Sequence, residues 1–274
     1  MTPTLALSHG GPVPQLGLGT WPMDDDEAAR VIPLAVECGW RLVDTAAKYG
    51  NERGVGRGIR ACGLPRAELF VTTKLDGGYQ GDGKAVQGLD SCLDRLGLDY
   101  VDLLLIHWPQ PWRDRYVDTW RTFERLLEDG RTRAIGVSNF KPAHLDRLVS
   151  ETGTVPAVNQ IQLSPYTPRR ESRVANQRHG VVTQSWSPLG RGSDLLREPA
   201  VAAIADELGT TPGQVVLRWH VQQGLAAVPK SSDRTRLRQN LDVFGFELSP
   251  TQLARLDTLD RGESAAVDSD TSGH

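Results

Sequence analysis

Four reactive side chains in the first half of the chain have the types needed for acid–base chemistry on a small molecule. Asp44, Tyr49, Lys74 and His107 are a carboxylate, a phenol, an amine and an imidazole. Asp44, Lys74 and His107 each directly follow a short apolar run, which indicates a buried strand. Because neighbouring strands lie about 4.8 Å apart, side chains at their ends can converge on one atom. We therefore expect these groups to form one site.

The chemistry that suits this set is proton donation by Tyr49. The pKa of a tyrosine in water is about 10, which is too high for a ready donor at neutral pH, and a nearby ammonium lowers it. We predict that Lys74 supplies this charge, that Asp44 holds Lys74, and that His107 orients the oxygen that receives the proton. Each residue alone has an ordinary explanation as a helix cap, a solvated amine or a satisfied polar group. The hypothesis depends on their joint position at matched strand ends.

The pattern along the chain predicts alternating strands and helices, and therefore a parallel α/β barrel with right-handed crossovers. Strands are expected at residues 16–20, 41–44, 69–73, 101–106, 134–137, 157–160, 181–185 and 226–229. Helices are expected at residues 26–38, 52–62, 84–96, 116–128, 143–150, 172–179 and 212–223. Two short apolar runs at 5–7 and 13–16 flank Gly10-Gly11, which predicts an N-terminal hairpin that closes the barrel bottom. Residues 1–274 are expected to be one domain, with a flexible tail at 263–274.

Composition narrows the class of protein. The chain has 274 residues, of which 39% are hydrophobic and 24% charged, enough for one barrel core. A net charge of −3 does not favour a nucleic-acid or membrane partner. The three cysteines lack metal-ligand spacing and suit a reducing compartment. We expect a cytoplasmic monomer with no metal site and no membrane span.

Short motifs then indicate a family. In chain order they are Gly17-Leu18-Gly19-Thr20-Trp21, Asp44-Thr45-Ala46, Tyr49-Gly50-Asn51-Glu52, Thr73-Lys74, Ile106-His107-Trp108-Pro109, Gly136-Val137-Ser138-Asn139-Phe140 and Val228-Pro229-Lys230-Ser231. From Gly17 to about Leu259 the chain resembles an aldo-keto reductase, and in detail the bacterial branch similar to 2,5-diketo-D-gluconic acid reductases. The resemblance implies a (β/α)8 TIM barrel that binds a nicotinamide cofactor in extended form at its C-terminal face. It also implies that Asp44, Tyr49, Lys74 and His107 are the catalytic tetrad.

The cofactor would be bound without a glycine-rich phosphate loop. The sequence contains no G-x-G-x-x-G, and the glycines at 54, 56 and 58 have the wrong spacing and lie in a predicted helix, so a Rossmann dehydrogenase is disfavoured and a packing role is expected. The resemblance assigns the nicotinamide carboxamide to Ser138, Asn139 and Gln160. It assigns ring stacking to Trp186, for which core packing is the alternative. It assigns the pyrophosphate to Ser187, Leu189 and Gly190.

Cofactor choice depends on the basic stretch that follows the last predicted strand. Hydroxyls and cations at a helix start form an anion site. Lys230, Ser231 and Arg236 match residues that hold the 2′-phosphate in similar proteins, and Asn240 matches one that contacts adenine. A solvated basic helix face is the alternative, and Asp233 weakens the positive field. We predict NADPH in preference to NADH.

Two functions from different classes remain. The preferred one is an NADPH-dependent oxidoreductase that reduces aldehyde or ketone carbonyls to alcohols, with Trp21 and Trp108 lining the substrate pocket beside Tyr49 and His107. The alternative is an NADP(H)-binding redox-sensing regulatory subunit with little turnover, for which a large exposed apolar patch or an additional N-terminal arm would be expected. A metal-dependent hydrolase is disfavoured because no His-x-His motif follows a strand.

Overall fold

The centre of the molecule is a closed parallel sheet. The computed structural model describes residues 2–81 and 83–273, and eight strands pair in chain order. They are β3 (Leu18–Gly19), β4 (Leu42–Asp44), β5 (Phe70–Leu75), β6 (Leu103–Ile106), β7 (Ile135–Ser138), β8 (Val158–Gln162), β9 (Val182–Trp186) and β10 (Ala226–Ala227). Leu16 forms a parallel bridge with Ala227, and the Gly17 amide donates to the Ala227 carbonyl at 2.9 Å. The last strand therefore returns to the first, and the predicted barrel is confirmed.

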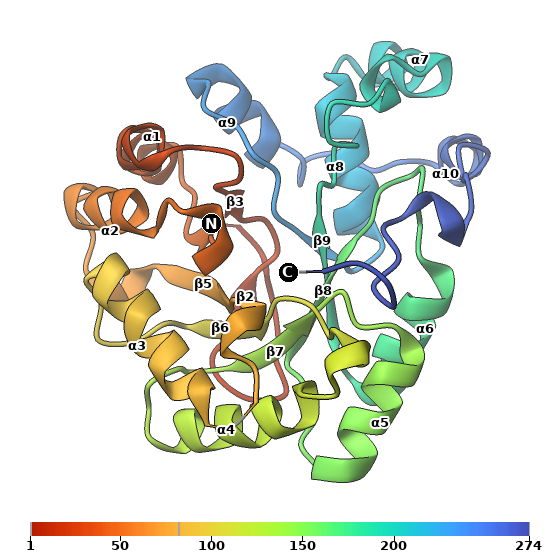
Figure 1. The fold of residues 1–274 in the computed structure, drawn as a ribbon. Helices are drawn as coiled ribbons and strands as arrows, with labels where there is room; N and C mark the ends of the chain where they lie inside the picture. The colour runs from red at the N-terminus through yellow and green to blue at the C-terminus, as the bar shows by residue number, and fades with distance from the viewer. Residues whose placement is uncertain (1, 82, 274) are drawn as a thin grey trace.

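Helices surround the strands (Figure 1). They are α1 (Asp25–Glu37), α2 (Glu52–Ala61), α3 (Lys84–Leu96), α4 (Tyr116–Glu128), α5 (Pro142–Thr152), α6 (Arg170–His179), α7 (Pro199–Leu208), α8 (Pro212–Gln222), α9 (Arg234–Leu241) and α10 (Pro250–Asp257). All seven helices bounded from the sequence are confirmed, with ends that differ by at most two residues. The sequence prediction missed α7 and α10 and gave no bounds for α9.

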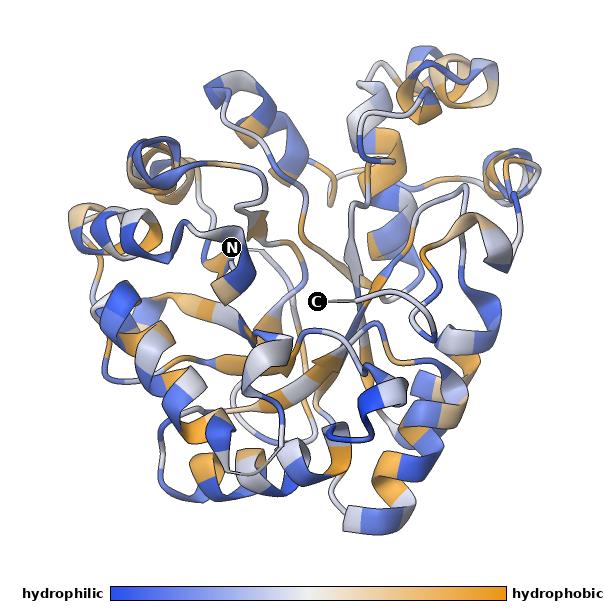
Figure 2. Cartoon of the chain, in the orientation of Figure 1, coloured by the Kyte–Doolittle hydropathy of each residue, from blue (hydrophilic) through white to orange (hydrophobic). Residues whose placement is uncertain are grey.

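The helices pack on the barrel through apolar stripes. In α4, Trp120 and Phe123 are 0% exposed, whereas Asp118 and Arg121 on the same helix have side chains about half exposed. Burial of one such aromatic side chain contributes about 1.5–3 kcal/mol. Figure 2 shows the same alternation of apolar and polar positions along several of the outer helices. The periodicity in the sequence therefore corresponds to the face that each helix turns to the sheet.

A hairpin marks the end of the barrel away from the reactive residues. Strands β1 (Thr4–Leu5) and β2 (Val13–Pro14) pair antiparallel, with Leu5 opposite Val13. His9, in the connecting loop, accepts a hydrogen bond from the Ile135 amide at the first residue of β7. The hairpin therefore lies at the amino ends of the strands, as predicted, and the carboxyl ends face the opposite side.

Helix α2 makes very close contacts with its neighbours through glycine. A methyl group at Gly54 would lie 2.0 Å from the Asp25 carbonyl oxygen in α1, and one at Gly56 would lie 2.0 Å from the Leu96 carbonyl oxygen in α3. Gly58 likewise faces Ile32 of α1, where a methyl would be 2.8 Å away. These glycines serve helix packing, as the sequence predicted.

The C-terminal segment crosses the carboxyl end of the barrel (Figure 1). The Val267 amide donates to Gln162 at the end of β8, and Lys141 Nζ lies 2.5 Å from Asp268 Oδ1. A methyl at Gly273 would lie 2.8 Å from Trp108 Cβ. Residues 263–273 thus have a defined course, and their predicted flexibility in solution stays a prediction. Residue 274 lies outside the described residues.

Candidate active site

The fold brings the four predicted catalytic residues to one place. Asp44 is the last residue of β4, and His107 directly follows β6. Tyr49 is the last residue of a 3-10 turn, η1 (Ala47–Tyr49), that follows β4. Lys74 lies inside β5, because this strand extends to Leu75 and not only to residue 73 as predicted. The residue is 0% exposed, so its side chain projects into the barrel and not into solvent.

The Lys74 ammonium connects the site. Its Nζ donates to Asp44 Oδ1 at 2.6 Å, to the Thr45 carbonyl at 2.9 Å and to the Tyr49 hydroxyl at 3.1 Å. Asp44 is 2% exposed. An ammonium has three N–H donors, and here each has an acceptor. The buried charge is therefore compensated, which burial of an ion requires.

The electrostatics keep Lys74 charged and Tyr49 protonated. Burial lowers the pKa of Lys74, but Asp44 and Tyr49 together raise it above its ordinary value. Burial raises the pKa of Tyr49, and the charge of Lys74 only opposes this rise. The prediction that Lys74 brings the pKa of Tyr49 below its ordinary value is therefore wrong, because the loss of water around the phenol has the larger effect. Tyr49 accordingly holds its proton at neutral pH.

His107 stands beside the phenol. The two rings meet edge to face, with centroids 5.8 Å apart and planes at 75°. His107 also stacks on Trp108, with centroids 6.4 Å apart. The His107 carbonyl accepts a hydrogen bond from Asn139 Nδ2 at 3.0 Å. Both the ring and the backbone of His107 are thus held in place next to Tyr49.

The residues predicted for the nicotinamide also lie together. Ser138 Oγ donates to the Gln160 carbonyl at 2.8 Å and accepts from Asn139 Nδ2 at 3.0 Å. Trp186 Nε1 donates to Asn139 Oδ1 at 2.8 Å. Asn139 and Ser187 adopt positive φ angles of 64° and 52°, a left-handed conformation that few non-glycine residues adopt. The ends of β7, β8 and β9 thus form one polar cluster against His107.

Gln160 joins this cluster to the tetrad. Its Nε2 donates to Asp44 Oδ2 and to Gln184 Oε1, both at 2.7 Å. Within residues 2–81 and 83–273 its Oε1 accepts no hydrogen bond, so an acceptor is left for a carboxamide N–H. The indole N–H of Trp186 is bonded to Asn139, and its ring is partly buried against the cluster of Val13, Leu42 and Val228, so its predicted stacking role stays a prediction. These residues fit a nicotinamide. The sequence prediction missed Gln184, although its position between Val182 and Trp186 on one face of the strand was a usable signal.

The residues predicted for the 2′-phosphate surround the start of α9. Ser231 is 5% exposed, and Asp233 caps the helix by accepting from the Arg236 amide at 2.8 Å. The Arg236 guanidinium lies 3.8 Å from Asp233 Oδ1, and Lys230 Nζ lies 3.1 Å from Glu27 Oε1. Asn240 is 6% exposed on the same helix. Each of the two cations faces a carboxylate, and their phosphate-binding role stays a prediction.

Comparison with known proteins supports the predicted resemblance. The model of the aldo/keto reductase family matches residues 15–261. The chain belongs to the aldo/keto reductase family. It is 47% identical over 269 residues to 2,5-diketo-D-gluconic acid reductase B of Corynebacterium sp., which covers 98% of this chain and 97% of the relative. It is 42% identical over 274 residues to methylglyoxal reductase DkgA of Yersinia pestis, which covers 100% and 98%.

A solved structure matches over the same length. A crystal structure of a Gox0644 mutant in complex with NADPH superposes with a TM-score of 0.93 at 39% identity, covering 100% of both chains. The barrel and the family that the sequence predicted are therefore confirmed for this aldo/keto reductase.

The mouth of this aldo/keto reductase contains a cation that the sequence analysis missed. The guanidinium of Arg191 lies 4.5 Å from the ring centroid of Trp21, which is 43% exposed. Arg191 follows the loop of Ser187, Leu189 and Gly190, and its charge is among those that lower the pKa of Tyr49. Trp108, on the other wall, is 8% exposed. The two tryptophans predicted to line the pocket therefore stand near Arg191 and His107 respectively.

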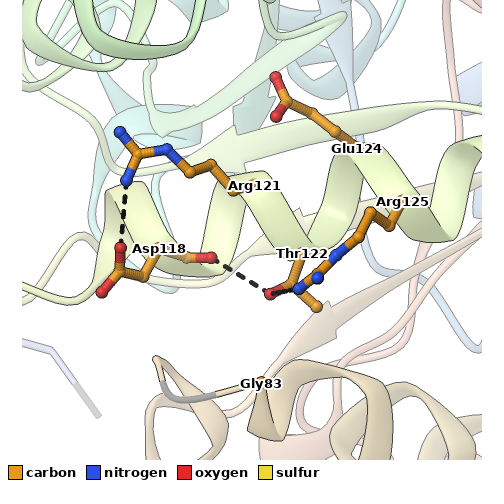
Figure 3. A pocket seen from close by; sticks show the side chains of 6 residues that line it. All are labelled: Gly83, Asp118, Arg121, Thr122, Glu124 and Arg125. Carbon is orange, nitrogen blue, oxygen red and sulfur yellow. Dashed lines mark hydrogen bonds and ion pairs between the residues drawn. The ribbon is translucent and has the colours of Figure 1, made fainter.

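A hollow of the reductase away from these residues carries none of this chemistry. It lies along α4 and is lined by Gly83, Asp118, Arg121, Thr122, Glu124 and Arg125 (Figure 3). Arg121 pairs with Asp118, and Arg125 donates to Thr122, so the polar groups largely satisfy one another. Within residues 2–81 and 83–273, no group of three His, Cys, Asp or Glu side chains could hold a metal ion. In the same residues, no helix has the length and apolar character needed to cross a membrane.

Proposed function

We propose that this aldo/keto reductase uses NADPH to reduce aldehyde or ketone carbonyls to alcohols, with Tyr49 as the proton donor. The observation that carries the proposal is the buried Lys74, which contacts both Asp44 and Tyr49 beside His107 and the nicotinamide cluster. Family membership, the reductases among its relatives and the NADPH in a structural neighbour support it.

Each residue of the tetrad has a separate task. When bound, NADPH supplies a hydride to the carbonyl carbon. Tyr49 donates its proton to the carbonyl oxygen, and Lys74 stabilises the charge left on the phenolic oxygen. Asp44 keeps Lys74 charged and in place, and His107 orients the carbonyl oxygen. The low exposure of Lys74 and Asp44 strengthens these interactions, because they act out of contact with water.

The cofactor contacts follow the clusters described above. The carboxamide would be held by Ser138, Asn139 and Gln160, with Trp186 stacked on the ring. The pyrophosphate would lie along Ser187, Leu189 and Gly190, the 2′-phosphate at Lys230, Ser231 and Arg236, and the adenine at Asn240. Trp21 and Trp108 would form the aromatic walls of a pocket for a small carbonyl compound. Two relatives are named for the reduction of a diketo sugar acid and of methylglyoxal, which favours substrates of this size.

Replacement of the acid tests the proposal. Tyr49→Phe should lower kcat with a panel of aldehydes and ketones by about 10²–10⁴-fold, because the ring remains and only the proton donor is lost. The Kd for NADPH, measured by fluorescence, should remain within about twofold, since the hydroxyl does not touch the predicted cofactor contacts.

Tyr79→Phe is the matched control, because Tyr79 is 36% exposed on a neighbouring loop and should be replaceable without effect. Reductase activity that survives Tyr49→Phe would show that another group is the acid. NADPH binding by the unmodified protein without turnover of any carbonyl in the panel would instead favour the regulatory alternative.

A further inference from the structure

A continuous line of buried side chains crosses the barrel interior and ends at the proposed acid. It begins at Gln184 in β9 and passes through Gln160 in β8 to Asp44 in β4, a step that spans from the sixth barrel strand to the second. From Asp44 it continues through Lys74 to Tyr49. Gln184 and Gln160 are register partners on adjacent strands and are 0% and 1% exposed.

The geometry fixes the amide of Gln160. An amide nitrogen has two protons, and those of Gln160 point to two acceptors, Asp44 Oδ2 and Gln184 Oε1, each at 2.7 Å. If the Gln160 amide were rotated by 180°, its oxygen would face two other acceptors, the Asp44 carboxylate and the Gln184 oxygen. These two acceptors therefore hold the amide nitrogen toward Asp44. Within residues 2–81 and 83–273 the oxygen accepts no hydrogen bond, so it is left for a ligand.

Gln184 is an unusual residue to find buried here. Within residues 2–81 and 83–273, its own Nε2 is buried and has no hydrogen-bond partner. An unpaired buried donor destabilises a fold by about 1–3 kcal/mol, so packing alone does not account for a glutamine at this position. What Gln184 does provide is the acceptor that Gln160 uses.

We propose that Gln184 is a positioning residue for the reduction: it orients the Gln160 amide so that the nitrogen stays on Asp44 and the oxygen receives the cofactor carboxamide. The inference rests on the proposed function and deepens it. Gln160 then links the proton-donating residues to the cofactor, because its nitrogen contacts the carboxylate that holds Lys74 and its oxygen contacts the nicotinamide carboxamide.

A single replacement tests this role. Gln184→Met keeps the length and approximate volume of the side chain but removes the acceptor. It should lower kcat and weaken NADPH binding by about fivefold each, as expected for the loss of one hydrogen bond of about 1 kcal/mol. Gln184→Glu retains an acceptor and should restore most of both. If Gln184→Met does not fold, Gln184→Asn replaces it, because its shorter amide cannot reach Gln160.

The pH profile gives a readout that a purely structural role would not change. The groups that face Tyr49 are Lys74 from β5, Asp44 from β4, the Arg191 charge from the loop after β9 and the His107 ring after β6. Without the Gln160 hydrogen bond, the Asp44 charge acts more strongly on Tyr49. The alkaline limb of kcat/KM should therefore move to higher pH in Gln184→Met.

Gln15→Met is the matched control. Gln15 is also buried, and it donates to the Val221 and Leu225 carbonyls at the opposite end of the barrel. It should change the melting temperature without moving kcat, NADPH affinity or the pH limb. The inference is overturned if Gln184→Met behaves like Gln15→Met in all three. That result is distinguishable from failure of the proposed function, in which the unmodified protein reduces no carbonyl although it binds NADPH.

Discussion

A buried ammonium sets demands on the residues around it. Lys74 needs three acceptors, and one of them is the Thr45 carbonyl. That carbonyl is held because Thr45 Oγ1 donates to Asn51 Oδ1 at 2.8 Å, and Asn51 Nδ2 in turn donates to the Met23 carbonyl at 2.9 Å. The Asp44-Thr45 and Asn51 parts of the sequence motifs are thus explained by the needs of one charge.

Arg191 permits a prediction about the acid. With Tyr49 as the proposed proton donor, reduction requires its protonated form, so activity is lost as the pH rises through the pKa of Tyr49. Burial raises the pKa of Tyr49 above its ordinary value, and the positive charge of Arg191 partly opposes this rise. Arg191→Gln should therefore move the alkaline limb of kcat/KM to higher pH. The measurement is a pH–rate profile at low ionic strength, because salt screens an exposed charge.

Arg197→Gln serves as the control for charge loss, since Arg197 is also exposed and lies six residues further along the same segment. A limb that stays in place or moves to lower pH in Arg191→Gln would contradict the assignment of this charge to the mouth of the site.

At the scale of single residues, the sequence predicted which residues come together better than it predicted their pKa shifts. The four predicted catalytic residues could be brought together because Asp44, Lys74 and His107 each follow an apolar run and Tyr49 comes five residues after Asp44. The contact between Gln160 and Asp44 could not, because it joins residues 116 positions apart across the barrel. The direction of the Tyr49 pKa shift depends on how much water the fold removes, which the residue types alone do not reveal.

Among elements, the strands and the single helices between them could be predicted from the sequence. Helices beyond this strict alternation, α7 and α10, could not. Helix α7 was missed because one helix is enough for the crossover between β9 and β10, and α8 already filled that place. Helix α10 follows α9 after the last strand, where the alternation no longer requires an element. Both begin with a first-turn proline, and Ser249 and Gln252 form a capping box at α10, so local signals were present.

Helix α9 leads to a prediction about cofactor preference. Asp233 caps this helix, but its charge stands beside the predicted phosphate contacts. Asp233→Ser keeps a good N-cap and removes the charge. The ratio of kcat/KM with NADPH to that with NADH should rise by about fivefold, because only NADPH carries the 2′-phosphate. Steady-state kinetics with both cofactors measure it, and NADH is the internal control. An unchanged ratio would show that the phosphate lies elsewhere.

For the molecule as a whole, buried histidines connect stability to pH. His220 on α8 is 0% exposed and contacts the Val216 carbonyl at 2.9 Å. Burial lowers its pKa to about 4, although its backbone contacts oppose the shift. Burial also lowers the pKa of His9 and of His144. The folded protein therefore resists protonation at positions where the unfolded chain accepts it.

The consequence is a loss of stability in mild acid. Below pH 6.5 the unfolded chain protonates His220, while the folded protein does not until about pH 4. The free energy of unfolding should fall by about 1.5 kcal/mol between pH 6.5 and 5 from this group alone. Urea unfolding at both pH values checks this. His220→Gln, which cannot titrate, should show a smaller difference between them, and an equal difference would refute the assignment.

The glycines of α2 limit how this enzyme can be engineered. Exchange of helical glycine for alanine is a common route to heat resistance, since it can add up to about 1 kcal/mol per position. At Gly54 and Gly56 the new methyl would instead collide with main-chain oxygens of two neighbouring helices. Helix α2 starts three residues after Tyr49, so any displacement that relieved the collision would also shift this proposed proton donor. A library of glycine-to-alanine variants should therefore leave these two positions unchanged. Alanine there would reduce both the thermal tolerance and the turnover of the enzyme.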